Sequence, residues 1–133
     1  MWRSVLLLPI AAVALACSAA GVPGPPPAPV EAGWQEEGEA SWYGAPFHGE
    51  ETASGEIYDM EGATAAHPSL PFGTVVHVRN LDNGRETTLR VNDRGPFVDG
   101  RILDVSRKGA RELGLLTPGT AQVRITVVEE PER

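Results

Sequence analysis

The feature that most limits the fold of this chain is a set of short segments in which apolar and polar residues alternate. Residues 74–80 and 86–92 alternate in this way, and a last segment places Val123, Ile125 and Val127 on one face. A period of two residues is typical of a strand with one buried face. No long stretch has the 3.6-residue period of a helix. The pattern therefore predicts an all-β domain.

Glycine, proline and capping residues divide the same region into further short elements. Additional strands are expected at residues 38–44, 64–67 and 101–105. One short helix is expected at 107–113, because Ser106 is a good N-cap and Gly114 a good helix end. The Asn83-Gly84 pair predicts a tight hairpin turn. Many short strands with a single short helix predict a small β-barrel.

The N-terminal residues indicate export. The apolar run 5–16 is too short to span a bilayer, which takes about 20 apolar residues, and it is typical of a secretory signal. Residues 14–17 resemble a bacterial lipoprotein cleavage site, at which Cys17 becomes the lipidated first residue of the mature protein. The alternative is an ordinary signal peptide, cut after Ala16 or Ala20, with Cys17 incidental.

Composition divides the chain into four parts. Residues 1–16 are expected to be the lipoprotein signal peptide, and 17–37 a Pro-rich and then acidic linker. Proline at the density of residues 21–30 favours extended polyproline II, which suits a tether. The domain is expected at 38–129, about 90 residues and enough for one modest core, followed by a tail at 130–133. The resulting localisation is the cell envelope, with a lipid anchor in a membrane.

The charge of the chain excludes some partners. With a net charge of −7, the protein has no basic patch to attract nucleic acid or other anionic polymers. A neutral glycan is compatible with this charge. His48, His67 and His77 do not follow a metal-ligand spacing, so neither a metal nor another cofactor is expected. We expect a monomer.

Several motifs resemble the rare lipoprotein A (RlpA) family. They occur in the family's order at residues 38–44, 47–49, 52–60, 64–67, 80–85, 91–97 and 101–106. The resemblance implies a six-stranded double-psi β-barrel. It also implies an endolytic lytic transglycosylase of peptidoglycan that prefers glycan strands lacking stem peptides and leaves a 1,6-anhydro-muramic product. The chain is more distantly similar to the first domain of expansins and to small barrel endoglucanases.

The resemblance assigns four catalytic candidates. Asp104 matches the proton donor of the expansin and endoglucanase relatives, while Glu56, His67 and Asp93 match positions of the RlpA family. The residues themselves support an acid at Asp93 or Asp104, because each ends a strand where partial burial favours a protonated carboxyl. Glycosidic cleavage needs such an acid near the bridging oxygen. Either one remains a candidate for the main acid.

Each candidate also has a structural interpretation. Asp93 could cap a turn or pair with the neighbouring arginine, and Asp104 could bond backbone N–H groups near the helix start. Glu56 lies in the long surface loop expected at 46–62, where most glutamates are only solvated. His67 could be a structural hydrogen-bond donor.

Substrate-binding residues are expected in the same motifs. Aromatic faces stack on sugar rings, so Trp42, Tyr43 and Tyr58 are candidates, although Trp42 and Phe97 could instead be core residues. Polar contacts are expected from His48, Asn92 and Arg94.

Three functions stay open on the sequence alone. The first is a lytic transglycosylase, the second a non-catalytic, expansin-like module that binds glycan or loosens the wall. The third is an inverting hydrolase, which needs two carboxyl groups separated by room for a water molecule.

Overall fold

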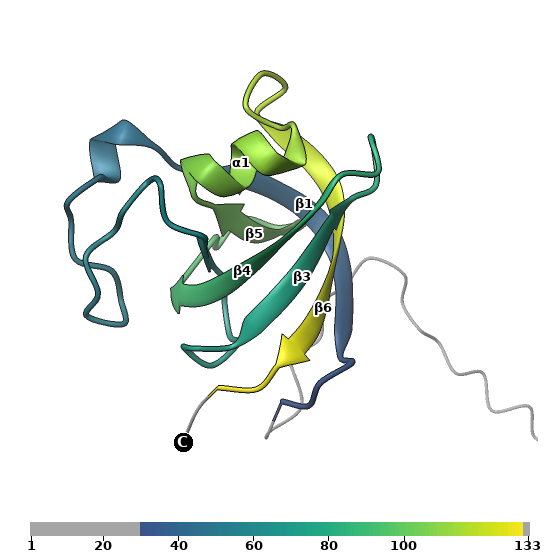
Figure 1. Ribbon diagram of the computed structural model, residues 1–133, viewed down its shortest axis with the longest axis horizontal. Helices are drawn as coiled ribbons and strands as arrows, with labels where there is room; N and C mark the ends of the chain where they lie inside the picture. Colours follow the sequence, from purple (N-terminus) through teal and green to yellow (C-terminus); the bar gives the residue numbers. More distant parts are fainter. Residues whose placement is uncertain (1–29, 132–133) are drawn as a thin grey trace, which may run out of the picture.

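The computed structural model of the protein describes residues 30–131. In this region the chain forms a closed six-stranded barrel with one α-helix (Figure 1). The elements in chain order are β1 (Gln35–Trp42), the 3-10 helix η1 (Ala45–Phe47), β2 (Thr64–Ala66), β3 (Val75–Asn80), β4 (Glu86–Asp93), β5 (Arg101–Val105), α1 (Arg107–Leu113) and β6 (Thr120–Glu129). The predicted all-β, six-stranded barrel with one short helix is confirmed. The signal peptide expected at 1–16, most of the linker expected at 17–37, and Cys17 lie outside the described residues.

The order of strands around the barrel is β1-β5-β2-β4-β3-β6, and β6 closes it by pairing with β1. The pairs β1–β5 and β2–β4 are parallel, whereas the other neighbours are antiparallel. Parallel neighbours cannot be joined by a tight turn, so a longer segment connects each of these pairs. The connection from β1 to β5 begins with a long loop between β1 and β2, and this loop builds part of the candidate site.

The interior of the barrel is filled by the alternating apolar residues. Val76, Leu89, Val91, Val123 and Ile125 are all at most 1% exposed. Apart from the buried Asn92, their neighbours in the sequence face outward, as expected for strands with one buried face. The helix α1 packs against β4, β1 and β5, and its buried face belongs to the same core.

The helix begins and ends where the sequence predicts. The Ser106 side chain accepts a hydrogen bond from the Gly109 backbone N–H at 3.1 Å, and Gly114 ends the helix with φ of 71°. Gly109 also allows close packing, since a Cβ at this position would lie 3.2 Å from both Leu89 Cδ1 and Val105 Cβ. The cap and this contact together fix α1 on the barrel.

Two local expectations are corrected by the structure. Strand β1 begins at Gln35, three residues before the expected start at Gly38, because β6 continues to offer partners as far as Thr126. The hairpin between β3 and β4 is wider than a two-residue turn. Gly84 has φ of 78°, but Asn83 has a negative φ, and the Gly84 N–H donates to Asn80 O at 2.7 Å.

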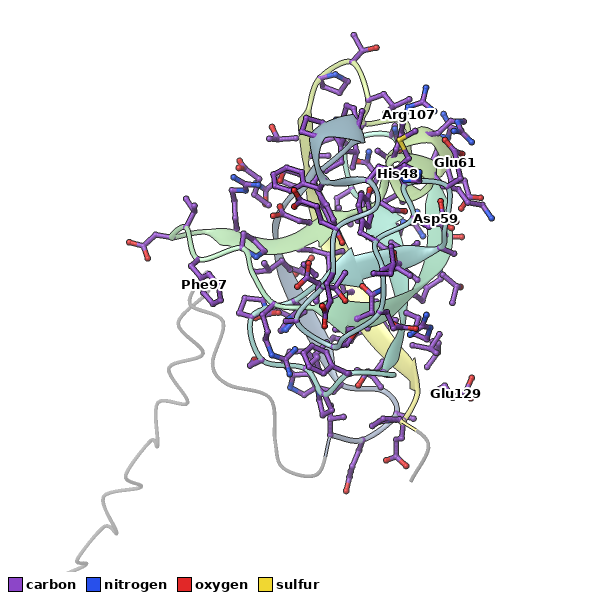
Figure 2. All side chains as sticks on the ribbon, turned by 90° about the vertical axis from the view of Figure 1, so that its left-hand side faces the viewer. His48, Asp59, Glu61, Phe97, Arg107 and Glu129 are labelled. Carbon is purple, nitrogen blue, oxygen red and sulfur yellow. The ribbon has the colours of Figure 1, made fainter. Side chains whose placement is uncertain are left out.

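The β1–β2 loop leaves the barrel and folds on itself (Figure 1). Within it, Tyr58 N–H donates to Glu50 O at 2.7 Å and Thr52 N–H donates to Glu56 O at 2.7 Å. On the connection between β4 and β5, Phe97 projects from the molecule and is 81% exposed (Figure 2). The alternative that Phe97 belongs to the core is therefore wrong. None of the helices within residues 30–131 has the length and apolar character needed to cross a membrane.

Candidate functional site

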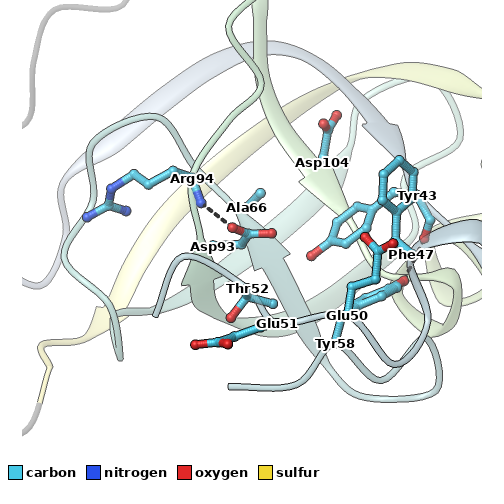
Figure 3. Close-up of a pocket in the computed structure, with 10 residues that line it drawn as sticks. All are labelled: Tyr43, Phe47, Glu50, Glu51, Thr52, Tyr58, Ala66, Asp93, Arg94 and Asp104. Atoms are coloured by element: carbon cyan, nitrogen blue, oxygen red, sulfur yellow. Dashed lines mark hydrogen bonds between the residues drawn. The ribbon is translucent and has the colours of Figure 1, made fainter. Parts of the chain in front are cut away.

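A pocket of about 200 Å³ lies between the β1–β2 loop and the ends of strands β2, β4 and β5 (Figure 3). It is lined by four carboxylates, three aromatic rings and three other residues: Glu50, Glu51, Asp93, Asp104, Tyr43, Phe47, Tyr58, Thr52, Ala66 and Arg94. Both acids that the sequence predicts at strand ends are in this set. The loop supplies six of the ten lining residues, so the pocket exists only when the loop is folded against the barrel.

The two aspartates are brought together by strand β2. Ala66 pairs with Asp93 of β4 on one side and with Asp104 of β5 on the other. Strands lie about 4.8 Å apart, so the two aspartate backbones are about 10 Å apart with only the small Ala66 side chain between them. The register of β2 against β4 shifts between Ala65 and Ala66, which sets Asp93 rather than Asn92 opposite Ala66.

Backbone donors hold the Asp93 side chain. Its Oδ1 atom accepts hydrogen bonds from the Arg94 N–H at 2.8 Å and from the Ala53 N–H of the loop at 3.0 Å. The pairing of Asp93 with the Arg94 side chain, one of the structural alternatives, is not made. The Arg94 guanidinium donates to Leu70 O at 2.6 Å and lies 4.0 Å from the ring centroid of Phe72.

A different set of groups holds Asp104. Its Oδ1 atom accepts from Arg101 Nη2 at 2.6 Å and from the Ser41 hydroxyl, and Arg101 also donates to Ser41. Ser41 is on β1, which pairs with β5 so that Ser41 lies beside Asp104. Asp104 is therefore tied to a cation, whereas Asp93 is tied to neutral backbone amides. The sequence pattern did not identify Ser41 or Arg101 as part of the site.

Aromatic rings form one wall of the pocket. The Tyr43 and Tyr58 rings lie 4.3 Å apart, and Phe47 meets Tyr43 edge-on at 6.0 Å. The Tyr58 hydroxyl donates to the Tyr43 backbone carbonyl at 2.6 Å. Burial, followed by the nearby Asp93 charge, raises the pKa of Tyr43 well above its usual value near 10, so this hydroxyl keeps its proton. Trp42 is not in the pocket and packs partly buried against the core.

Glu56 lies outside the pocket and is held by an arginine. Both oxygens of its carboxylate accept from Arg90, at 2.7 and 2.9 Å. The hydrogen bond to Arg90 holds the pKa of Glu56 below its usual value near 4.5, and the Asn92 side chain adds to this shift. A carboxylate so stabilised in its ionised form is a poor proton donor. Asn92 itself is buried, and its backbone carbonyl accepts from Ser54 of the loop at 3.3 Å.

His67 also lies outside the pocket, inside the protein. It is 2% exposed, and its Nε2 contacts Glu36 Oε1 at 2.8 Å. Its Nδ1 accepts from the backbone N–H groups of Ser69 and Leu70, each at 3.0 Å. Since Nδ1 accepts two hydrogen bonds, the ring proton is on Nε2 and points at Glu36. These contacts match the structural interpretation of His67.

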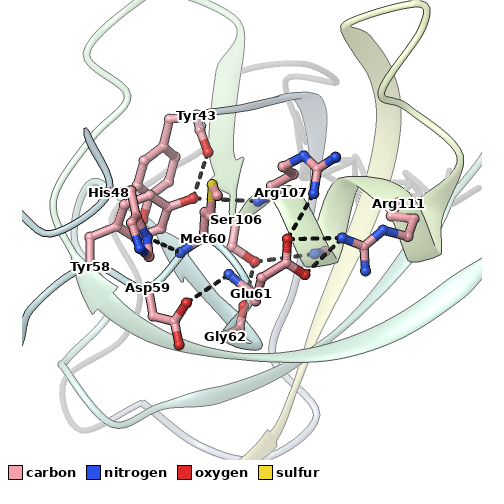
Figure 4. Close-up of polar contacts among 11 residues, drawn as sticks. Tyr43, His48, Tyr58, Asp59, Met60, Glu61, Gly62, Ser106, Arg107 and Arg111 are labelled. Carbon is pink, nitrogen blue, oxygen red and sulfur yellow. Dashed lines mark hydrogen bonds and ion pairs between the residues drawn. The ribbon is translucent and has the colours of Figure 1, made fainter. Parts of the chain in front are cut away.

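His48 is exposed, is not among the residues that line the pocket, and lies beside Met60 (Figure 4). Its Nδ1 accepts from the Met60 backbone N–H at 3.2 Å. Close by, Glu61 pairs with Arg107 at 2.8 Å and with Arg111 at 2.7 Å, which ties the end of the loop to α1 (Figure 4). The position of His48 indicates a role in the loop fold.

The loop residues Glu50, Glu51 and Thr52 line the pocket and were not among the sequence candidates. A polar surface loop carries no periodic pattern, so nothing in the sequence separates these residues from solvated neighbours. Within residues 30–131, no group of three or more His, Cys, Asp or Glu side chains is arranged to hold a metal ion.

Comparison with known proteins places this barrel in a family. A family model described as "Lytic transglycolase" matches residues 35–125. The chain belongs to the lytic transglycolase family. Its resemblance to RlpA proteins is confirmed by curated relatives named "Endolytic peptidoglycan transglycosylase RlpA". The Vibrio cholerae protein is 56% identical over 96 residues, which cover 72% of this chain and 36% of the relative. The Campylobacter jejuni protein is 48% identical over 102 residues, which cover 77% and 37%. The chain thus spans about a third of the length of these two relatives.

Solved structures confirm the double-psi barrel fold. A Streptomyces papain inhibitor has a TM-score of 0.60 at 21% identity, and the match covers 74% of this chain and 97% of the inhibitor. The expansin of Clavibacter michiganensis has a TM-score of 0.59 at 21% identity, with 75% of this chain and 53% of the expansin covered. At this level of identity the similarity concerns the fold alone.

Proposed function

We propose that this domain is an endolytic lytic transglycosylase that cleaves the glycan strands of peptidoglycan, with a preference for strands lacking stem peptides. The observation that carries the proposal is the pair Asp93 and Asp104, set on either side of Ala66 in one pocket. Stacked aromatic rings beside two carboxylates suit a sugar ring and the bond to its neighbour. The names of the curated relatives support the same activity.

Asp93 is the better general acid of the two. Its Oδ1 atom is satisfied by two backbone amides, which leaves Oδ2 to carry a proton toward the bridging oxygen of the glycan. The Oδ1 atom of Asp104 is instead held by the Arg101 guanidinium at 2.6 Å and by the Ser41 hydroxyl, so the negative charge of Asp104 lies beside a cation. We assign Asp93 as the acid and Asp104 as the negative charge that stabilises the positive charge developing on the sugar.

The proposed reaction needs one acid and consumes no water. Asp93 protonates the glycosidic oxygen as the C1–O bond breaks, and the leaving sugar departs with a free hydroxyl. The C6 hydroxyl of the remaining muramic sugar then attacks C1 and transfers its proton to the Asp93 carboxylate. The product is a 1,6-anhydro end, and Asp93 is protonated again. This scheme uses no cofactor.

The test is digestion of purified, peptide-free glycan strands, with mass spectrometry of the products. The proposal predicts 1,6-anhydro ends from the wild-type protein and none from Asp93→Asn. Reducing ends would show hydrolysis instead. Intact strands that the protein nevertheless binds would show a non-catalytic, glycan-binding module.

The proposal extends to the placement of the protein in the cell. We propose that residues 1–16 are a signal peptide, that Cys17 is lipidated, and that the residues up to the start of β1 tether a monomeric barrel to a membrane of the cell envelope. A Cys17→Ala variant is then released from the membrane fraction on cell fractionation. Unchanged membrane association of that variant would contradict the anchor.

A further inference from the structure

One hydroxyl of the pocket has no hydrogen-bond partner within residues 30–131. Three hydroxyl groups line the pocket, from Tyr43, Thr52 and Tyr58. Thr52 donates to Glu56 O at 2.8 Å, and Tyr58 donates to the Tyr43 carbonyl at 2.6 Å. The Tyr43 hydroxyl oxygen is buried and makes no hydrogen bond within the part of the chain that the structure describes. Buried polar atoms without a partner are uncommon, so this atom requires an explanation.

The surroundings of this hydroxyl determine what it can bind. Besides Asp93, assigned above as the acid, the pocket contains the carboxylates of Glu50, Glu51 and Asp104, and an ionised carboxylate can only accept hydrogen bonds. Burial and the neighbouring aspartates raise the pKa of Tyr43, so its O–H remains a donor at any physiological pH. Figure 3 shows the Tyr43 ring on the same side of the pocket as Asp104, with its hydroxyl toward Asp93. Tyr43 thus offers a neutral donor among acceptors.

The ring is also held in place before any ligand arrives. The Tyr43 backbone N–H donates to Val105 O at 3.1 Å, its carbonyl accepts from Tyr58, and its ring packs between Tyr58 and Phe47. A side chain fixed in this way loses little conformational freedom when a ligand binds. The free O–H is therefore a preorganised donor, suited to one particular acceptor.

The chemistry of glycans identifies that acceptor. Sugar hydroxyl groups can donate to the carboxylates of the pocket, but an oxygen that carries no hydrogen needs a donor from the protein. In N-acetylated sugars the strongest such acceptor is the carbonyl oxygen of the acetamido group at C2. We propose that the Tyr43 hydroxyl donates a hydrogen bond to this acetamido carbonyl, and that Tyr43 thereby selects N-acetylated glycans over glucans. This inference deepens the proposed function. It depends on that function only in assuming that a glycan binds in the pocket.

The test compares two neutral β-1,4-linked ligands, chitohexaose and cellohexaose, which differ only in carrying an acetamido group or a hydroxyl at C2. Binding to the wild-type protein is measured by calorimetry and is expected to favour chitohexaose. One neutral hydrogen bond corresponds to about a threefold to tenfold change in affinity. Tyr43→Phe is therefore expected to weaken chitohexaose binding by that factor and to leave cellohexaose binding within about twofold.

A stability measurement separates recognition from a structural role. Because the Tyr43 hydroxyl has no hydrogen-bond partner among the described residues, Tyr43→Phe is expected to melt at the wild-type temperature or above it. Tyr58→Phe is the matched comparison, and it is expected to melt at a lower temperature because it loses the bond to the Tyr43 carbonyl. A lower melting temperature for Tyr43→Phe, or an equal loss of affinity for both ligands, would overturn the inference.

The remaining outcomes are also decisive. A wild-type protein that binds neither ligand, or both equally, refutes selection by Tyr43. A wild-type protein that discriminates at C2 through Tyr43 but leaves peptide-free glycan strands uncut keeps this inference and refutes the proposed cleavage. The binding and cleavage assays therefore fail independently.

Discussion

We expect the His67→Ala variant to lose stability, because this ring organises the chain around it through three hydrogen bonds. Its Nδ1 accepts from the backbone N–H groups of Ser69 and Leu70, and its Nε2–H donates to Glu36. Alanine removes all three bonds. The Glu36 side chain is 7% exposed, so water cannot fully replace the lost donor.

The size of the effect follows from these contacts. A buried donor or acceptor that loses its partner costs about 1–3 kcal/mol, and a charged one costs more. Two of the groups that lose a partner are buried, the Leu70 N–H and the Glu36 carboxylate. The free energy of unfolding should therefore fall by about 3–5 kcal/mol, the range found when one partner of a buried pair is removed. A domain of this size has a free energy of unfolding of about 5–15 kcal/mol. We therefore expect the melting temperature to fall by about 12 °C or more.

Urea unfolding followed by tryptophan fluorescence measures this change. Trp34 is a suitable probe, because its ring meets His67 edge-on at 6.3 Å. Asp93→Asn serves as the control, since the asparagine oxygen can still accept from Ala53 and Arg94, and we expect its free energy of unfolding to stay within about 1 kcal/mol of wild type. If His67→Ala folds as stably as this control yet cleaves no glycan, His67 takes part in the chemistry and the structural assignment is wrong.

Three further predictions concern the other acids and the barrel. Asp93→Asn should abolish the formation of anhydro ends, whereas Asp104→Asn should leave detectable cleavage; the reverse ranking in the same digestion would exchange their roles. Glu56→Gln should lower the free energy of unfolding by less than about 1 kcal/mol at neutral pH, because the Glu56 side chain is 43% exposed. The pKa of Glu56 is lowered in the folded protein, so this difference should be present above about pH 4.5 and vanish as the pH falls through the folded pKa. If urea unfolding at pH 2 still shows a stability difference between wild type and Glu56→Gln, the ionised Glu56 carboxylate is not its cause. Gly38→Ala would bring a methyl group 2.7 Å from Ile102 Cγ2, and we expect a loss of about 1–3 kcal/mol in thermal unfolding; a neutral effect would show that the β1–β5 contact can relax.

The elements that depend on local interactions were predictable from the sequence. The period of two residues identified β3, β4 and β6, because a strand that buries one face needs apolar side chains at every second position. The bounds of α1 followed from Ser106 and Gly114, whose cap geometries involve only residues within one turn of the helix. The motifs resembling RlpA proteins led to the family, which the match over residues 35–125 confirms.

What the sequence by itself could not determine is which candidates share one pocket. Asp93 and Asp104 meet because β2 pairs with both β4 and β5, and that pairing order is a long-range property with no local signal. The same long-range packing buries His67 beside Glu36, 31 positions earlier in the chain, and leaves Glu56 with Arg90 outside the pocket. Residue types, spacing and the resemblance to RlpA proteins predicted Asp93, Asp104, Tyr43 and Tyr58 of the site, but not the other carboxylates that line it. Only the closed barrel decided which of them face the same space, because strand order and register set the distances between side chains far apart in sequence.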